Sequence, residues 1–100
     1  MSQRYPCRIS AQHPSLPGHF PGHPVVPGVV LLSEVGARVR DFLGHPVRIT
    51  GAPTVKFTHP LLPDTDFEIV IESGKTSAVK FQCLQDSTQL ASGSLTYVPV

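Results

Sequence analysis

Residues 17–35, PGHFPGHPVVPGVVLLSEV, change character abruptly in the middle of the stretch. The first half is dense in proline and glycine, and the second half is an apolar run that ends in Ser33 and Glu34. Proline fixes its own φ and biases the residue before it toward an extended conformation, so a stiff, non-helical loop is predicted. Such a loop positions side chains, and this one carries His19 ahead of a helix start.

The apolar run predicts the one convincing helix of the chain, beginning near Pro27 or Gly28 and ending at about Leu43, with Gly44 as a stop signal. One stripe of apolar residues follows helical spacing: Gly28, Leu31, Leu32, Val35, Val39, Phe42 and Leu43. The first turn, VVLL, is apolar all round, so we expect it to be buried on every side. The later half is expected to show three charged residues to water: Arg38, Arg40 and Asp41.

Alternating patterns elsewhere predict β-strands, at residues 5–10, 47–57, 66–73, 77–85 and 90–98. The second of these is either one long strand or a pair broken at Gly51 and Pro53. One strand, one helix and about four antiparallel strands predict an α+β fold in which a curved sheet wraps one central helix. Such a sheet leaves an edge and a face open, which favours a dimer.

Length and composition limit the classes of function. One hundred residues predict a single domain, residues 1–100, and 40% hydrophobic residues with a net charge of +1 argue against a disordered tail or a nucleic-acid binder. The beginning, MSQRYPCRIS, lacks the apolar core of a signal peptide, and no apolar segment reaches membrane length. We therefore expect a cytoplasmic protein that binds neither nucleic acid nor membrane.

The cysteines and histidines do not predict a metal site. Cys7 and Cys83 belong to no CxxC or Cys/His cluster, so two reduced thiols are expected. His19 and His23 have a spacing that suits a metal only on a helix, and the prolines exclude a helix there. Neither a metal nor a cofactor is predicted.

The helix start is a candidate binding site for an oxygen that carries or develops negative charge. The first amide groups of a helix lack intrahelical partners and lie at the positive end of its dipole. Gly28 has no side chain to block a ligand from this backbone. His19, held by the stiff loop, could act there as a base, or it could be a loop histidine that only bonds a nearby carbonyl.

Two segments resemble a known family. Residues 18–32, GHFPGHPVVPGVVLL, are very similar to the signature loop of the hotdog-fold 3-hydroxyacyl-(acyl carrier protein) dehydratases of fatty acid biosynthesis, in which H-F-P-x-x-P-V-x-P-G-V leads into the central helix. Residues 55–72, VKFTHPLLPDTDFEIVIE, resemble the family's K-F-x-x-P-V-x-P-G-D segment, with Asp64 in place of its glycine. The four kept positions of this second motif are Lys56, Phe57, Pro60 and Pro63. The resemblance covers most of the chain.

The resemblance implies a single hotdog fold and roles for particular residues. His19 matches the catalytic histidine that removes the proton α to the thioester carbonyl. Gly28 matches the glycine whose amide holds the carbonyl oxygen as an enolate develops. Val25 falls where the loop backbone holds the histidine ring, and Val29 belongs to the apolar turn that would line an acyl tunnel or simply pack in the core. In the family, active sites form at the dimer interface.

The sequence departs from the family at one catalytic position. An Asp or Glu lies fourteen residues after the family's histidine, and that position here is Ser33. Glu34 follows, but one residue along a helix is about 100° of rotation, so the two lie on opposite flanks of the apolar stripe. Glu34 could reach the site in the real geometry, or it could simply pair with Arg38 four residues on. Ser33 could orient the substrate hydroxyl or a water, or only fill space.

Three functions remain open. The first is a dehydratase of 3-hydroxyacyl thioesters, carried by acyl carrier protein or coenzyme A, in fatty acid, aryl polyene or polyketide-like biosynthesis. The second is a catalytically weak hotdog subunit that binds acyl thioesters or pairs with an active relative. The third is an acyl thioesterase. A homodimer or a mixed dimer is expected, and exposed arginines either dock an acidic carrier protein or form an ordinary solvated face.

Overall fold

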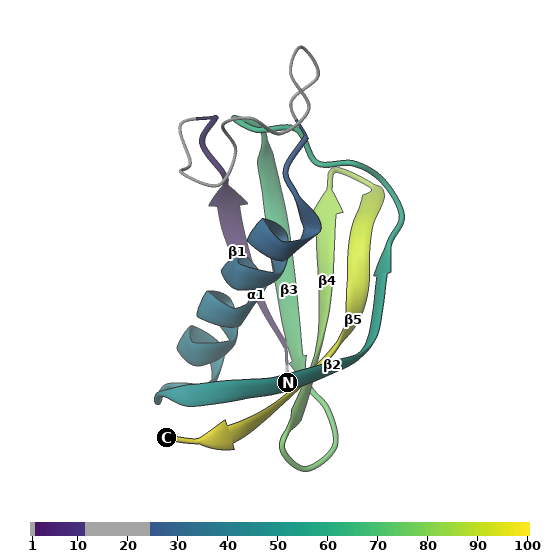
Figure 1. Ribbon diagram of the computed structural model, residues 1–100. Helices are drawn as coiled ribbons and strands as arrows, with labels where there is room; N and C mark the ends of the chain where they lie inside the picture. The colour runs from purple at the N-terminus through teal and green to yellow at the C-terminus, as the bar shows by residue number, and fades with distance from the viewer. Residues whose placement is uncertain (1, 12–24) are drawn as a thin grey trace.

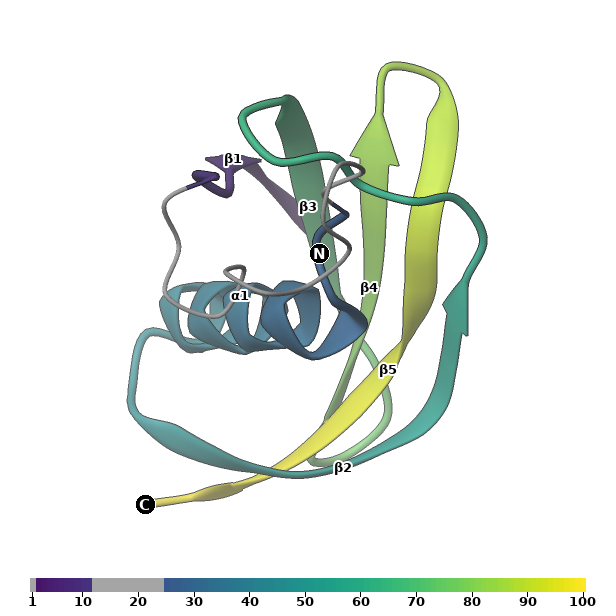
Figure 2. The same ribbon diagram turned by 45° about the horizontal axis from the view of Figure 1, so that its top comes forward.

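The computed structural model describes residues 2–11 and 25–100. The elements follow in the order β1 (Ser2–Arg8), α1 (Gly28–Leu43), β2 (Val47–Phe57), β3 (Asp66–Ser73), β4 (Ala78–Gln85) and β5 (Thr88–Pro99). The five strands form one antiparallel sheet in the order β1-β3-β4-β5-β2. The helix lies on the concave side of this sheet (Figure 1), and β2 curls beneath it (Figure 2). The predicted α+β arrangement of a curved antiparallel sheet around one helix is confirmed.

The core lies between the helix and the central strands. Alternate residues of β3 and β4 are buried, and the register places Ile69 opposite Cys83 and Ile71 opposite Phe81. These side chains share the concave face because successive residues of a strand point to opposite sides of a sheet. From the helix, Val35 and Val39 are fully buried.

The helix begins and ends where the sequence predicts. Gly44 follows its last residue in the left-handed conformation, with φ 78°, and its N–H donates to the Arg40 carbonyl at 2.9 Å. Glycine adopts this conformation without a steric penalty, so it ends the helix cleanly. The prediction that the first turn is buried on every side is wrong, because Val29 is 73% exposed. Val30 and Leu31 of the same turn are buried, so the sheet covers one side of this turn and leaves the Val29 side open.

Two further expectations need correction, and one open alternative is decided. Strand β1 spans Ser2–Arg8 and not residues 5–10, because its pairing with β3 ends where Arg8 meets Asp66. Arg38 is less exposed than predicted, with 31% of its side chain open to water, and it pairs with Glu34 and Asp41. Strand β2 is one long strand, although its pairing with β5 shifts register on both sides of Gly51. Among the described residues, no helix is both long and apolar enough to cross a membrane.

Candidate functional site

The start of helix α1 has no capping side chain. Pro27 is the N-cap residue in an extended conformation and makes no side-chain hydrogen bond there, and the first turn contains no acidic residue. The N–H groups of Val30 and Leu31 donate to the Pro27 carbonyl at 3.0 and 3.2 Å. The amides before them point out of the helix, so the positive end of the helix is open to an oxygen ligand.

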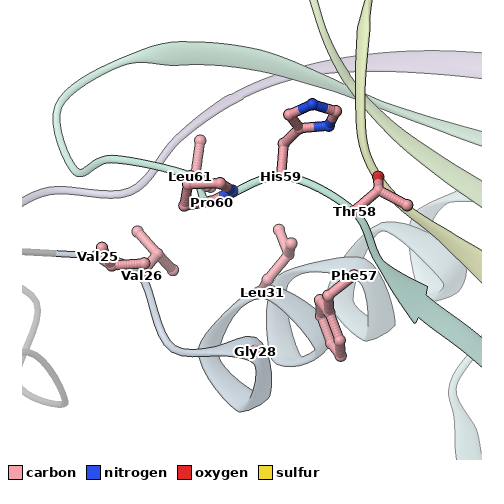
Figure 3. Close-up of a pocket in the computed structure, with 9 residues that line it drawn as sticks. All are labelled: Val25, Val26, Gly28, Leu31, Phe57, Thr58, His59, Pro60 and Leu61. Atoms are coloured by element: carbon pink, nitrogen blue, oxygen red, sulfur yellow. The ribbon is translucent and has the colours of Figure 1, made fainter.

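A largely apolar pocket of about 440 Å³ surrounds this helix start. Figure 3 shows the nine residues that line it, which come from the segment before α1, its first turns, the end of β2 and the segment after β2. They are Val25, Val26, Gly28, Leu31, Phe57, Thr58, His59, Pro60 and Leu61. Apolar walls with a few backbone donors are typical of small-molecule sites.

Gly28 is needed for close packing as well as for an exposed amide. A Cβ at this position would lie 2.8 Å from Cζ of Phe57, whose ring lies against the first turn in Figure 3. Phe57 is itself 53% exposed, so its ring forms part of the pocket wall. The absent side chain therefore makes room for the Phe57 ring, a role that the sequence did not reveal.

Backbone hydrogen bonds hold the two walls of the pocket together. Val26 N–H donates to the Leu61 carbonyl at 2.8 Å, which ties the segment before α1 to the segment after β2. Asp64 follows with φ 61°, and its N–H donates to the Ile9 carbonyl at 2.8 Å. Its Oδ1 also accepts from Ala11 N–H at 3.1 Å. Asp tolerates the left-handed region better than most residues, so Asp64 can replace the family's glycine.

His59 lies in the pocket wall, and sequence reasoning missed it. Its Nδ1 lies 3.1 Å from the Gln89 carbonyl, which can only accept, so Nδ1 carries the proton. Its ring points away from Gly28 in Figure 3. His59 therefore supports the segment after β2 and does not face the helix start as a base. His59 falls at a variable position of the second family motif, so the motif gave no signal for it.

The predicted site residues fall in three places. Val25 and Gly28 line the pocket at the helix start, while Val29 lies outside it on the exposed side of the first turn. His19, the predicted base, and His23 lie outside the described residues. The structure thus brings together the predicted oxyanion donor and apolar walls.

Ser33 and Glu34 face opposite flanks of the helix, as the rotation per residue predicts. Ser33 is exposed and lines a second hollow, between the helix and β2. Glu34 lies on the β1 side, with Oε1 3.9 Å from Nη2 of Arg38. Arg38 also pairs with Asp41 at 3.3 Å. Glu34 is therefore paired with Arg38 on the flank away from the hollow that Ser33 lines.

The hollow beside Ser33 has a volume of about 500 Å³. We call it the β2-side groove, and its lining is Val29, Leu32, Ser33, Gly36, Arg40, Ile49, Thr50, Gly51, Ala52 and Leu95. Mostly apolar, it runs along the helix from the first turn to Arg40. Ser33 is thus a small polar residue in an apolar channel.

The two cysteines are free thiols and are poor nucleophiles. Burial raises the pKa of Cys83 to about 12, with a smaller contribution from Cys7. The pKa of Cys7 is raised by burial and then by Glu34, and lowered by Arg38. A thiolate is the reactive form, so neither thiol is activated. Among residues 2–11 and 25–100, no three His, Cys, Asp or Glu side chains are grouped as metal ligands.

Comparison with known proteins identifies related sequences. A family model described as ApeI-like, ApeI dehydratase, matches residues 2–94. The 3-hydroxyacyl-(acyl-carrier-protein) dehydratase FabZ of Thermus thermophilus is 33% identical, over 90% of this chain and 72% of that protein. FabZ of Pelotomaculum thermopropionicum is 34% identical, over 67% of this chain and 53% of that protein. The chain thus spans between about half and three-quarters of these relatives.

Solved structures share the fold. The dehydratase heterocomplex ApeI:P from Xenorhabdus doucetiae contains a chain that matches with a TM-score of 0.84 at 22% identity, over 96% of this chain and 86% of that chain. An acyl-CoA hydrolase variant from Staphylococcus aureus matches with a TM-score of 0.65 at 18% identity, over 98% of this chain and 65% of that chain. At these identities the likeness shows the fold alone, which is the predicted hotdog fold.

Proposed function

Because the chain belongs to the ApeI-like dehydratase family, we propose that it removes water from 3-hydroxyacyl thioesters to give trans-2-enoyl thioesters. The observation that carries this proposal is the uncapped start of α1 at Gly28, inside an apolar pocket. Backbone N–H groups there can stabilise the negative charge that develops on a thioester oxygen. The names of the FabZ relatives support acyl carrier protein as the carrier, with coenzyme A as the alternative.

The proposed reaction needs one base and one acid. His19 removes the proton from C2, and the electron pair passes through the enolate to form the C2–C3 double bond. The C3–O bond breaks, and the hydroxyl leaves as water after it receives a proton. Protonated His19 can return that proton, while Ser33 holds the hydroxyl or a water by a hydrogen bond. Serine has no suitable pKa for donating the proton itself near neutrality.

A second function is a subunit of low activity that pairs with an active relative. Two observations favour it: Ser33 stands where the family has an acid, and Glu34 is directed to the other flank of the helix. The ApeI:P structure is a heterocomplex by its description, which supports a mixed pair for this chain alongside a homodimer. Thioesterase activity ranks third, since its structural relatives share the fold alone. Cytoplasmic location, and a fatty acid, aryl polyene or polyketide-like pathway, remain parts of the proposal.

The test follows the reaction from both directions. The purified protein is incubated alone with a 3-hydroxyacyl thioester and, separately, with its enoyl product, and the approach to equilibrium is measured. We expect both to reach the same mixture, and His19→Ala to slow the approach by at least about a hundredfold. His45→Ala is the control, because His45 is exposed and lies outside the pocket. Full activity in His19→Ala would show that the site is wrong.

If the wild-type protein is inert, the second function is tested with the same assay. The protein is mixed with an active hotdog dehydratase, and complex formation and rate are measured together. A complex with altered rate supports a mixed pair. Release of free thiol from the thioester, without an enoyl product, would instead identify a thioesterase.

A further inference from the structure

Arg40 stands out in the β2-side groove because the rest of the lining is largely apolar or small. It is the one charged residue among the described residues that form this groove. It belongs to the sequence Arg38-Val39-Arg40, in which the central valine is fully buried. The two arginines therefore project on opposite sides of the buried valine, and only the second reaches the groove.

The Arg40 guanidinium is held in a defined position. Its Nε donates to the Val47 carbonyl at 3.2 Å, which anchors the side chain to the beginning of β2. Its Nη1 lies over Gly36, because a Cβ added there would be 3.8 Å from this atom. The backbone carbonyl accepts from Nε alone, so the terminal N–H groups remain available to a ligand in the groove.

The positive charge of Arg40 is not neutralised by the described part of the chain. No described carboxylate lies within ion-pair distance of it, whereas Arg38 pairs with both Glu34 and Asp41. Arginine is suited to binding carboxylate or hydroxyl oxygens because its planar fork presents several donors. The groove therefore offers an apolar wall and, at one point, an unused set of donors.

The position of the guanidinium relative to Ser33 limits the length of a ligand. Gly36 follows Ser33 by three residues and so lies about 4.5 Å farther along the helix axis. Nη1 of Arg40 lies 3.8 Å from where a Cβ of Gly36 would stand. Three or four carbon–carbon bonds span a distance of this order. A ligand whose C3 hydroxyl meets Ser33 would place the far end of a short acyl chain beside Arg40.

We propose that Arg40 determines specificity by binding a hydrogen-bond acceptor, a carboxylate or hydroxyl oxygen, at the far end of a short acyl chain in the β2-side groove. This inference rests on the proposed function, because Ser33 sets the position of the chain. The occupant is the acyl group of the thioester substrate. Charge complementarity supports it, since Arg40 has no carboxylate partner among the described residues and a charge-assisted hydrogen bond favours a polar end over a methyl end.

Binding and turnover are measured separately so that the two proposals can fail separately. Binding uses three coenzyme A thioesters that lack a 3-hydroxyl and cannot be dehydrated: hexanoyl, ω-hydroxyhexanoyl and adipyl. Turnover uses the corresponding 3-hydroxyacyl thioesters. We expect the adipyl or ω-hydroxyhexanoyl thioester to bind about tenfold more tightly than the hexanoyl thioester. Arg40→Gln should abolish this preference, and Arg48→Gln, which alters an exposed arginine outside the groove, should keep it.

A second variant tests the groove independently, in case Arg40→Gln does not fold. Gly36→Ala adds a methyl group at ordinary contact distance, 3.8 Å from both Arg40 Nη1 and Ile49 Cγ1, so the fold has room for it. The methyl narrows the groove between Ser33 and Arg40. We expect it to weaken binding of all three thioesters while thermal unfolding remains cooperative.

The possible outcomes separate the alternatives. Dehydration of all substrates without any preference for a polar end overturns the role of Arg40 and leaves the proposed function standing. A preference in binding that Arg40→Gln removes, without turnover, supports Arg40 and counts against catalysis by this chain alone. If Arg40→Gln changes the oligomeric state in light scattering and not the preference, a second copy covers the groove and the inference is wrong.

Discussion

The two flanks of helix α1 use their charges in opposite ways. On the β1 side, Arg38 lies between Glu34 and Asp41, so its charge is balanced within the helix. On the β2 side, Arg40 contacts only a backbone carbonyl among the described partners and borders an apolar groove. The first flank resembles an ordinary stabilised helix surface, and the second keeps a charge without a carboxylate partner beside an apolar groove.

This difference bears directly on the catalytic acid. Ser33 faces the flank with the groove, and Glu34 faces the flank with the balanced charges. Successive residues of a helix are rotated by about 100° around its axis, so a carboxylate at position 34 does not point in the direction of a side chain at position 33. The flank with the groove therefore has no Asp or Glu among the described residues that line it.

The largest expected effect is a loss of stability when the packing of β2 against β5 is disrupted. Gly93→Ala would push a Cβ against the Thr54 carbonyl and to within 2.9 Å of the Val55 Cα, which are backbone atoms of β2. We expect a loss of about 3 kcal/mol in the free energy of unfolding, because overpacking against backbone leaves little room to relax. Urea denaturation measures it. An unchanged midpoint would show that β2 does not lie this close to β5.

The next effect concerns catalysis. Ser33→Asp places a carboxylate on the groove flank, where the family carries its acid. If the wild-type chain is a weakened dehydratase, kcat/KM should rise at least about tenfold, since a positioned general acid contributes more than this in most enzymes. Glu34→Asp is the matched control on the other flank and should leave kcat/KM unchanged. A loss of activity in Ser33→Asp would mean that Ser33 has a role of its own.

A smaller change in stability is expected when a methyl group is added inside the β2-side groove. Gly36→Ala fills part of the groove without a close contact and replaces a helix-interior glycine. We expect the free energy of unfolding to rise by about 0.5–1 kcal/mol, because alanine loses less backbone freedom on folding. Thermal and chemical unfolding measure the gain. A loss of stability would place a side chain tightly against Gly36.

The smallest effect tests the β1 flank. Glu34→Gln removes one cause of the raised pKa of Cys7, although burial, the larger cause, remains. More thiolate is then present at a given pH, so Cys7 should react modestly faster with a thiol reagent at mildly alkaline pH. Ser33→Ala should leave the rate unchanged. Stability should fall by only a few tenths of a kcal/mol with the loss of the pair to Arg38. Equal rates in wild type and Glu34→Gln would contradict the placement of Glu34 near Cys7.

The helix and most strands could be predicted from the sequence because their signals are local. Periodic apolar residues and Gly44 set the ends of α1, and alternation set β3 and β4 closely. The exposure of Val29 could not be predicted, because the apolar residues of VVLL do not reveal which side of the turn the sheet leaves uncovered. The family resemblance pointed to Val25 and Gly28, but the packing of Phe57 against Gly28 joins segments far apart in the chain.

The sequence by itself determined the α+β class and the extent of α1. It also determined that Ser33 and Glu34 lie on opposite flanks of the helix, because rotation around a helix follows from residue number alone. Only the tertiary structure decided what each flank faces. Arg38 and Arg40 are two residues apart and chemically identical, yet one meets carboxylates and the other a groove. Their surroundings depend on where β1 and β2 close around the helix, and long-range strand pairing, not local sequence, sets that position.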